Sequence, residues 1–298
     1  MPDRPPFDAR RLDALLAGSV NHWDRLRFFD ETTSTQDALR LDLEAAPLRS
    51  PQVWRIAAAD AQTAGRGRTG ARWTAPARTS LLLTVGGPLP LAAELWPRAS
   101  LVAGLAVADA VARHAGVEVW LKWPNDLLVR APDRSWRKLG GLLCERVDLP
   151  GGVPAWLCGV GLNVAALAPG EWPDVVAQSA ASLDQIAPVP VSRESLAATV
   201  ADEIRSQVLD FARSGGVLDV RRLEARLAFR GVPVELDLGP TEARVWAMLD
   251  GVAPNGMPRV RRLRGTDPAA LGPVEEITPV SVVAAHSDPP WKAAARLD

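Results

Sequence analysis

The sequence predicts an α/β main domain followed by a small β-barrel. Over residues 25–229, short apolar runs bounded by turn residues alternate with longer stretches of helical periodicity. After Gly231-Val232-Pro233 the pattern changes to short strands separated by glycine, proline and asparagine turns. A chain of 298 residues is long enough for one main domain and a smaller one. We expect a lead over 1–24, the main domain over 25–229, the barrel over 230–286 and a tail over 287–298.

The first half of the main domain is expected to place two strands on either side of a basic loop. The expected order is a helix at Asp8–Ala17, a strand at Arg25–Asp30, a helix from Ser34 or Thr35 to about Ala46, and strands at Val53–Asp60 and Ser80–Val85. Ser34 or Thr35 is the expected N-cap of its helix. Leu91–Ala115 is a long apolar helix that we expect to pack across one face of the sheet and to end at Gly116.

The second half is expected to return to the sheet and then to build the barrel. Two strand-like pieces flank Trp123-Pro124-Asn125-Asp126, and further strands follow Gly140-Gly141 and include Leu157–Val164. After a proline- and alanine-rich loop over 165–190, we expect helices at Ser192–Phe211 and Leu218–Phe229. The barrel strands are expected at Val234–Leu238, Glu242–Leu249, Arg259–Arg264 and Glu275–Val283, with a hairpin turn at Asn255-Gly256.

Composition excludes several classes of protein. The formal net charge is −1, so no global positive field draws the chain to nucleic acid or to an anionic membrane. Cys144 and Cys158 are too few for a disulfide framework and lack the partners of a zinc site. Prolines at positions 2, 5 and 6 stand where a signal peptide needs an apolar core, and no uninterrupted apolar run is long enough to span a bilayer. We expect a soluble, cytoplasmic protein.

The loop Gln62–Trp73 combines three glycines with three arginines, at positions 66, 68 and 72. Glycine lets backbone N–H groups converge on a ligand, and arginine offers a charged fork that suits phosphate and carboxylate. Such a loop can hold two anions that would otherwise repel each other. The alternative interpretation is a flexible, solvated basic loop.

Lysine usage singles out a second position. Lysine occurs only at 122, 138 and 292, whereas the other 31 of the 34 basic residues are arginine. Lys122 and Lys138 both stand near glycine, proline or tryptophan in apolar surroundings. Since lysine is the compact point charge and arginine the bulkier fork, we interpret these lysines as groups that a site requires as a small ammonium.

The turn Lys122-Trp123-Pro124-Asn125-Asp126 carries a second group of candidates. Lys122 lies inside an apolar strand, where an unpaired ammonium is costly to bury. Asn125 is suited to read an amide or a ring edge, and Asp126 to hold Mg²⁺ through oxygen. The alternative is a hairpin turn with an incidental lysine.

Two pairs of glycines lie in expected strands. Gly140-Gly141 precede an apolar run, which suggests close backbone approach by a ligand or a bulge. Gly159 and Gly161 are two residues apart, so they share one face of the sheet. A bulge in a curved sheet is the alternative for each pair, and no glycine-rich helix start follows to make a dinucleotide fingerprint.

The motifs together are far more specific than any one of them. In order they read Thr33-Ser34-Thr35, Gly65–Trp73, Lys122–Asp126, Lys138–Leu142 and Gly159–Asn163. This series closely resembles the motifs of biotin–protein ligases, and the resemblance runs from about residue 25 to 285. It implies a mixed-sheet catalytic domain of the biotin/lipoate ligase type, backed by helices, with an SH3-like C-terminal barrel.

The resemblance also implies a two-step reaction. Biotin and MgATP give biotinyl-5′-adenylate, which then acylates a lysine of the biotin carboxyl carrier protein of acetyl-CoA carboxylase; the oligomeric state is left open between monomer and homodimer. Lipoate–protein ligases share the fold, but their Arg-Arg and Gly-Gly-Gly signatures are absent from this sequence. A biotin-responsive DNA-binding repressor is the other alternative, and the lead over 1–24 has too few apolar positions for a helix-turn-helix.

The resemblance assigns roles to individual residues. Lys138, Arg66 and Arg68 are implied as catalytic, and Asp126 as a Mg²⁺ ligand. The implied biotin-binding residues are Ser34, Thr35, Gln62, Gly65, Arg66, Lys138, Gly141 and Gly159; the implied nucleotide-binding residues are Arg68, Trp73, Asn125 and Asn163. Two positions depart from the family pattern: Gln36 replaces a frequent asparagine, and Ala71 stands where an arginine often follows the third glycine of the loop.

Overall fold

The structure is a computed structural model and describes residues 4–19, 23–46, 53–150, 153–167, 180–239, 244–263, 271–277 and 281–284. The chain divides into two compact units. The first comprises Met1–Val119 and Asn125–Gly216, and the second comprises Trp120–Pro124 and Val217–Asp298. The break after Gly216 places the segment 217–229, which the sequence assigns to the main domain, in the second unit.

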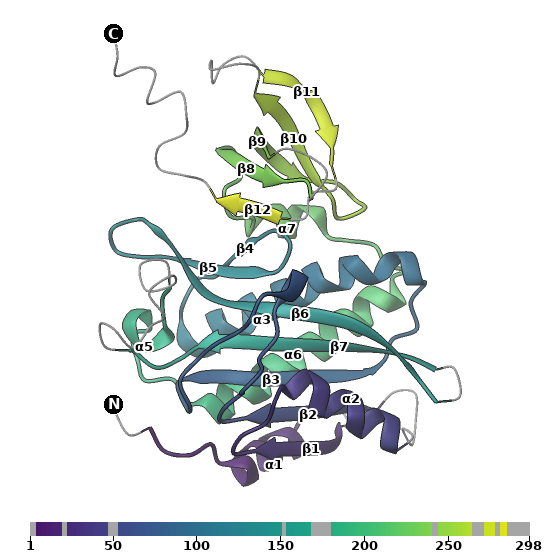
Figure 1. The fold of residues 1–298 in the computed structure, drawn as a ribbon, viewed down its shortest axis with the longest axis vertical. Helices are drawn as coiled ribbons and strands as arrows, with labels where there is room; N and C mark the ends of the chain where they lie inside the picture. Colours follow the sequence, from purple (N-terminus) through teal and green to yellow (C-terminus); the bar gives the residue numbers. More distant parts are fainter. Residues whose placement is uncertain are drawn as a thin grey trace. The chain divides into compact units, whose positions relative to one another are not determined.

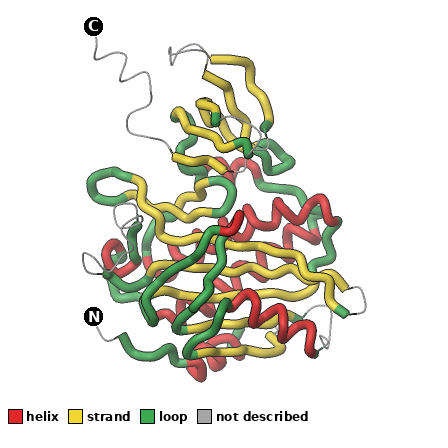
Figure 2. The backbone as a smooth tube through the Cα atoms, in the orientation of Figure 1, coloured by secondary structure: helices red, strands yellow, loops and turns green. Residues whose placement is uncertain are grey.

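A seven-stranded mixed sheet forms the centre of the fold, as expected from the sequence (Figures 1 and 2). Its strands are β1 (Trp23–Phe29), β2 (Trp54–Ala59), β3 (Ser80–Pro88), β4 (Trp120–Lys122), β5 (Asp126–Arg130), β6 (Trp136–Leu149) and β7 (Val153–Asn163). The order across the sheet is β1-β2-β3-β7-β6-β5-β4. β1 and β2 are parallel, whereas the pairs β2–β3, β3–β7, β7–β6 and β6–β5 are antiparallel.

Helices cover both faces of this sheet. They are α1 (Ala9–Ala17), α2 (Thr35–Ala45), α3 (Trp96–Ala115), α5 (Leu183–Ile186) and α6 (Arg193–Arg213). In Figure 1, α3 and α6 run side by side behind the sheet, while α2 lies in front of it. Helix α3 ends at Gly116, which takes the left-handed conformation at φ 65° as the sequence predicts.

Helix α3 and the turn before it resemble a membrane-spanning helix in length and composition. Residues Ala93–Ala115 are long and apolar enough to cross a bilayer, but 67% of the most apolar window is buried inside the protein. Packing against α6 and the sheet accounts for that apolar surface, as the sequence predicts for this segment.

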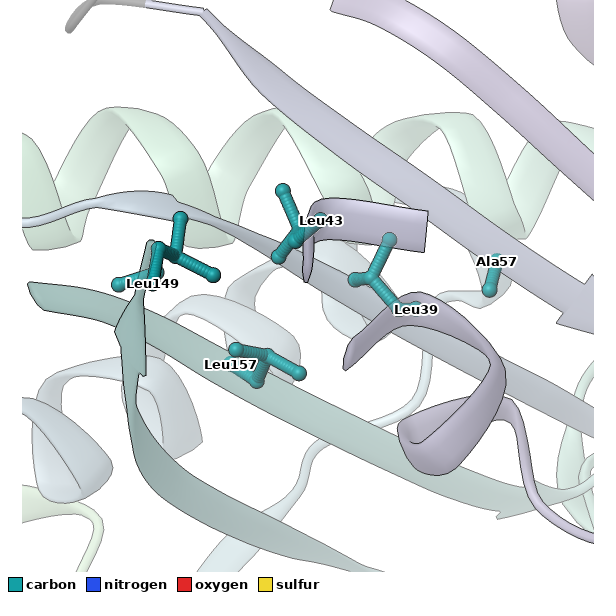
Figure 3. Packing of buried hydrophobic residues seen from close by; sticks show 6 residues of the cluster. Leu39, Leu43, Ala57, Leu149 and Leu157 are labelled. Carbon is teal, nitrogen blue, oxygen red and sulfur yellow. The ribbon is translucent and has the colours of Figure 1, made fainter. Parts of the chain in front are cut away.

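The core between α2 and the sheet defines the face on which the site lies. Leu39 and Leu43 of α2 pack against Ala57 of β2, Leu149 of β6 and Leu157 of β7 (Figure 3). Because side chains alternate along a strand, Gly159, Gly161 and Asn163 lie on the same face as Leu157. The prediction that the two glycines of β7 open one side of the sheet is therefore confirmed.

Several boundaries differ from those expected. A 3₁₀ turn at Ala93–Leu95 precedes α3, so the helix begins later than predicted. The helix expected at Leu218–Phe229 is confined to α7 (Val220–Ala225). Strand β6 begins at Trp136, and it therefore contains Lys138 and the glycine pair that the sequence placed before a strand. Of the predicted loop over 165–190, residues 168–179 lie outside the described residues, and the described part contains the short helix α5, which the sequence did not predict.

The second unit contains an antiparallel sheet in the order β11-β10-β9-β8-β12. Its strands are β8 (Pro233–Asp237), β9 (Val245–Val252), β10 (Pro258–Leu263), β11 (Leu271–Glu276) and β12 (Ser281–Ala284). The predicted hairpin turn at Asn255-Gly256 joins β9 to β10, with Gly256 at φ 87°. The single strand predicted at Glu275–Val283 is wrong, because its two ends belong to β11 and β12 at opposite edges of the sheet.

Candidate functional site

The basic loop between β2 and β3 folds back on itself. The Trp73 N–H donates to the Gly65 carbonyl oxygen at 3.0 Å, and the Gly67 N–H donates to the Ala71 carbonyl oxygen at 2.7 Å. A Cβ on Gly65 would lie 2.5 Å from the Trp73 carbonyl oxygen, so this crossing excludes any other residue. Two of the loop's glycines are thus used to close the loop, which holds its arginines in defined places.

Gln62 joins the loop to the start of α2. Its Oε1 accepts hydrogen bonds from the Thr35 N–H at 2.8 Å and from the Thr35 hydroxyl at 3.0 Å. The expectation that Ser34 or Thr35 is the N-cap is confirmed for the position, which Ser34 occupies, but the Ser34 side chain makes no cap hydrogen bond. Because Gln62 supplies the acceptor instead, the buried Ser34 hydroxyl is not used by the helix.

Lys138 and Asp126 form an ion pair beside Trp73. The Lys138 Nζ lies 2.6 Å from Asp126 Oδ1 and 6.0 Å from the centroid of the Trp73 ring. The lysine side chain is 39% exposed and the aspartate 17%, so the ammonium is held in place while still reaching solvent. An ammonium fixed in this way is ready to meet an anionic ligand.

A β-bulge turns Lys138 towards the site. In the pairing of β5 with β6, Leu127 opposes Gly140 whereas Leu128 opposes Lys138, so β6 contains one extra residue. In a regular strand Lys138 and Gly141 would point to opposite faces. Here the Lys138 Cε lies 3.7 Å from the place of a Cβ on Gly141. The bulge, which was one of the two interpretations of the glycine pair, is confirmed.

Arg68 and Asn125 lie next to this ion pair. Arg68 Nη1 donates to Asn125 Oδ1 at 3.4 Å, and Asn125 Nδ2 donates to the Leu142 carbonyl oxygen at 3.0 Å. Burial lowers the pKa of the Arg68 guanidinium, and the charge of Asp126 opposes that shift. A partly desolvated cation gains more from an anionic ligand than a fully hydrated one does.

Arg66 is held by two carboxylates that sequence reasoning missed. Its Nη1 and Nη2 donate to Glu145 Oε1 and Oε2 at 3.1 and 2.8 Å, and its Nη2 also lies 2.9 Å from Asp37 Oδ1. Glu145 is 79 residues from Arg66 along the chain and carries no motif of its own. Only the pairing of β6 within the sheet brings the two together.

The glycines of β7 form the floor of the site. A Cβ on Gly159 would lie 2.6 Å from Gln36 Oε1, and one on Gly161 would lie 2.6 Å from the Trp73 ring. The Trp73 Nε1 is buried and has no acceptor among the described residues. The glycines therefore let Gln36 and the indole of Trp73 approach the sheet closely.

Asn163 fixes the backbone beside the site. Its Nδ2 donates to the Ala181 carbonyl oxygen at 3.1 Å and to the Lys138 carbonyl oxygen at 3.4 Å, and the residue is only 5% exposed. In this structure Asn163 thus braces the strand that carries Lys138. Its predicted contact with a nucleotide stays a prediction.

The described residues contain no group of three or more histidine, cysteine, aspartate or glutamate side chains that could hold a metal ion. Asp126 is the carboxylate beside Lys138 and Arg68, and it is paired with Lys138. Mg²⁺ that arrives with ATP needs only one or two protein carboxylates, since phosphates and waters supply its other ligands. The donor set therefore fits a metal bound mainly by the nucleotide.

Lys122 belongs to the second unit, so the structure does not relate it to these residues. The remaining predicted residues lie in the first unit, in two neighbouring groups on the α2 face of the sheet. One group links the start of α2 to the loop and to Gly159. The other gathers the cations and the aspartate around Trp73 and Gly141.

Residues 28–163 match the Biotin/lipoate A/B protein ligase family. The biotin–acetyl-CoA-carboxylase ligase of Mycobacterium tuberculosis is 34% identical over 243 residues, which cover 79% of this chain and 84% of that protein. The chain belongs to the biotin–protein ligase family. The bifunctional ligase/repressor BirA of Escherichia coli is 32% identical over 184 residues, which span 55% of its own length.

Solved structures support the fold. Biotin protein ligase from Aquifex aeolicus, in complex with biotin and ATP, superposes with a TM-score of 0.63 over 85% of this chain and 95% of its own, at 24% identity. The enzyme from Leishmania major with biotinyl-5-AMP gives a TM-score of 0.57 over 86% of this chain and 99% of its own, also at 24% identity. Both comparisons identify the α/β fold of this family.

Proposed function

We infer that this chain is a biotin–protein ligase that forms biotinyl-5′-adenylate from biotin and ATP and transfers biotin to a lysine of a carrier domain. The observation that supports this function most strongly is that Lys138 and Arg68 lie beside Asp126, next to Gly159 and Gly161 of β7. The geometry gives no reason to prefer lipoate over biotin as the substrate, and the relatives named as biotin ligases support biotin as the substrate.

In the first step the biotin carboxylate attacks the α-phosphorus of ATP, a P–O bond forms, and the bond to pyrophosphate breaks. Two anions at a separation of ~4 Å repel each other by ~4 kcal/mol at an effective dielectric of 20. Arg66, Arg68 and Lys138 supply fixed positive charge that offsets a term of this size. In the second step the acceptor amine attacks the acyl carbon and AMP leaves.

The two groups of residues divide the ligand between them. Ser34, Thr35, Gln62 and Gly65 would hold biotin at the start of α2, while Gly141 and Gly159 leave room along the sheet. Trp73, Asn125 and Asn163 would lie towards the adenylate. A Mg²⁺ ion bound with ATP near Asp126 would neutralise phosphate charge.

ATP–pyrophosphate exchange tests the reaction directly. We expect the purified chain to exchange labelled pyrophosphate into ATP when biotin is present and not when lipoate replaces it. Transfer is then measured with a biotin carboxyl carrier domain and with the same domain lacking its acceptor lysine. Exchange that depends on lipoate, or on neither acid, would assign the site to another reaction.

Ligands are expected to protect the basic loop from trypsin. Thr69, Gly70, Ala71 and Arg72 are exposed in the loop, so the peptide bonds after Arg68 and Arg72 are accessible in the free protein. Biotin together with ATP should draw the arginines onto anions and slow cleavage there. Cleavage after Arg134, an exposed residue in the turn between β5 and β6, serves as the internal control and should not change. Equal cleavage of the loop with and without ligands would contradict anion-induced ordering.

Further features follow from the same proposal. The second unit would be the SH3-like domain of the family, its five antiparallel strands being the described part of that barrel. The acceptor would be the biotin carboxyl carrier protein of acetyl-CoA carboxylase in the cytoplasm, with the chain acting as a monomer or a homodimer. Binding to a membrane or to nucleic acid plays no part in this function.

The chain is expected not to bind an operator, unlike a bifunctional ligase/repressor. Its N-terminal helix α1 packs on α6, with Leu12 and Leu16 buried, and so belongs to the first unit instead of forming a separate DNA-binding module. A mobility-shift assay with DNA from upstream of biotin-synthesis genes, with and without biotin and ATP, measures this. Saturable, sequence-specific retardation at physiological salt would overturn the expectation.

A further inference from the structure

Arg66 carries two carboxylate partners although it lies at a site proposed to receive anions. Glu145 accepts from both terminal nitrogens of the guanidinium, at 3.1 and 2.8 Å. Asp37 makes a single contact, from its Oδ1 to Nη2 at 2.9 Å. The guanidinium is 35% exposed, so one partner can be exchanged for a ligand without unfolding the surroundings.

The two carboxylates use different parts of the guanidinium. A bidentate carboxylate on Nη1 and Nη2 occupies the end of the fork, and the remaining edge presents the Nε–H together with the second N–H of Nη2. In this structure the Arg66 Nε is buried and has no acceptor among the described residues. The edge that Asp37 contacts is thus only half satisfied, whereas the end held by Glu145 is fully satisfied.

Asp37 also contacts a second cation, which remains its partner when it leaves Arg66. Its Oδ1 accepts from Arg40 Nη2 at 2.7 Å, one turn further along α2. Glu145 has a different setting, since it extends from the middle of β6, where pairing with β7 fixes the backbone. Releasing Asp37 from Arg66 therefore costs less than releasing Glu145.

We propose that Glu145 is a positioning residue that holds Arg66 for catalysis, and that Asp37 is an internal stand-in for the substrate anion, displaced when the carboxylate of biotin arrives. With both carboxylates in place, Arg66 has two negative partners for one positive charge. An incoming anion would be repelled unless one of them withdraws. The exchange of Asp37 for the anion satisfies Nε and keeps the number of negative charges beside Arg66 at two.

The proposal rests on the proposed function, and it makes opposite predictions for the two carboxylates. Glu145→Gln should lower kcat for biotin-dependent pyrophosphate exchange by ~10²-fold, because a misplaced guanidinium no longer meets the reacting groups. Asp37→Asn should lower the KM for biotin by about 2- to 5-fold with kcat unchanged, the range expected for loss of a competing half-exposed ion pair. The alcohol analogue of biotin has no carboxylate, so Asp37→Asn should leave its binding unchanged.

Controls separate this proposal from the proposed function and from loss of fold. Wild-type exchange with biotin must be present; its absence refutes the ligase function itself. Asp148→Asn changes an exposed aspartate on the same strand and should alter nothing. Thermal unfolding shows whether each variant is folded. If Glu145→Gln is unfolded, Glu145→Asp replaces it, because that substitution keeps the negative charge. Glu145→Asp should lose less activity than Glu145→Gln. An active wild type overturns the proposal if both variants change kcat/KM for biotin in the same direction, or if neither variant changes it.

Discussion

Replacing Lys138 by alanine is expected to lower the rate of adenylate formation by ~10²–10³-fold while the protein remains folded. The ammonium is a preorganised charged donor, held 2.6 Å from Asp126 on the face where the anions would meet. Loss of one such donor costs a factor of this size in other enzymes. The fold is retained because the side chain is 39% exposed, and a pair of that kind contributes little to stability.

The measurement for Lys138→Ala is biotin-dependent pyrophosphate exchange under single-turnover and steady-state conditions. The matched control is Arg137→Ala, which removes the adjacent cation of β6, paired with the exposed Asp133 in the hairpin. This control should keep near-normal activity. Comparable adenylate formation by wild type and Lys138→Ala would reject the catalytic assignment of the lysine.

Replacing Gly140 by alanine is expected to destabilise the first unit strongly. The added Cβ would lie 2.3 Å from the Gly161 carbonyl oxygen, a backbone atom that cannot move without shifting β7. Overpacking of this kind costs ~1–3 kcal/mol or more. Each kcal/mol lowers the Tm by about 2–4 °C in a domain of this size. Thermal unfolding followed by circular dichroism measures the change.

The neighbouring glycine supplies the control for Gly140→Ala. A Cβ on Gly141 would meet its nearest atoms, the Asn125 carbonyl oxygen and Asp126 Oδ1, at 3.5 Å, which is ordinary contact distance. Gly141→Ala should therefore unfold at nearly the wild-type temperature. If the two variants lost stability equally, the contact between Gly140 and β7 would not be the reason for the glycine pair.

Patterns that depend on neighbouring residues were predictable from the sequence. The strands around the basic loop, the end of α3 at Gly116 and the turn at Asn255-Gly256 follow from alternation, capping and turn chemistry within a few residues. The shared face of Gly159 and Gly161 follows from the same alternation. Local rules were less successful at the ends of elements. Helix α3 begins later than predicted, because tertiary packing overrides local helix propensity at its start.

The sequence by itself singled out residues that the structure gathers at the candidate site: Arg66, Arg68, Lys138, Asp126 and the glycines of β7. The tertiary structure alone decided how they are held. The bulge that turns Lys138 towards Gly141 exists only in the register between β5 and β6, which one strand cannot specify. The partners of Arg66 and the cap that Gln62 provides for α2 come from distant segments. Such contacts depend on which strands pair, and strand pairing is determined by the packing of the whole sheet.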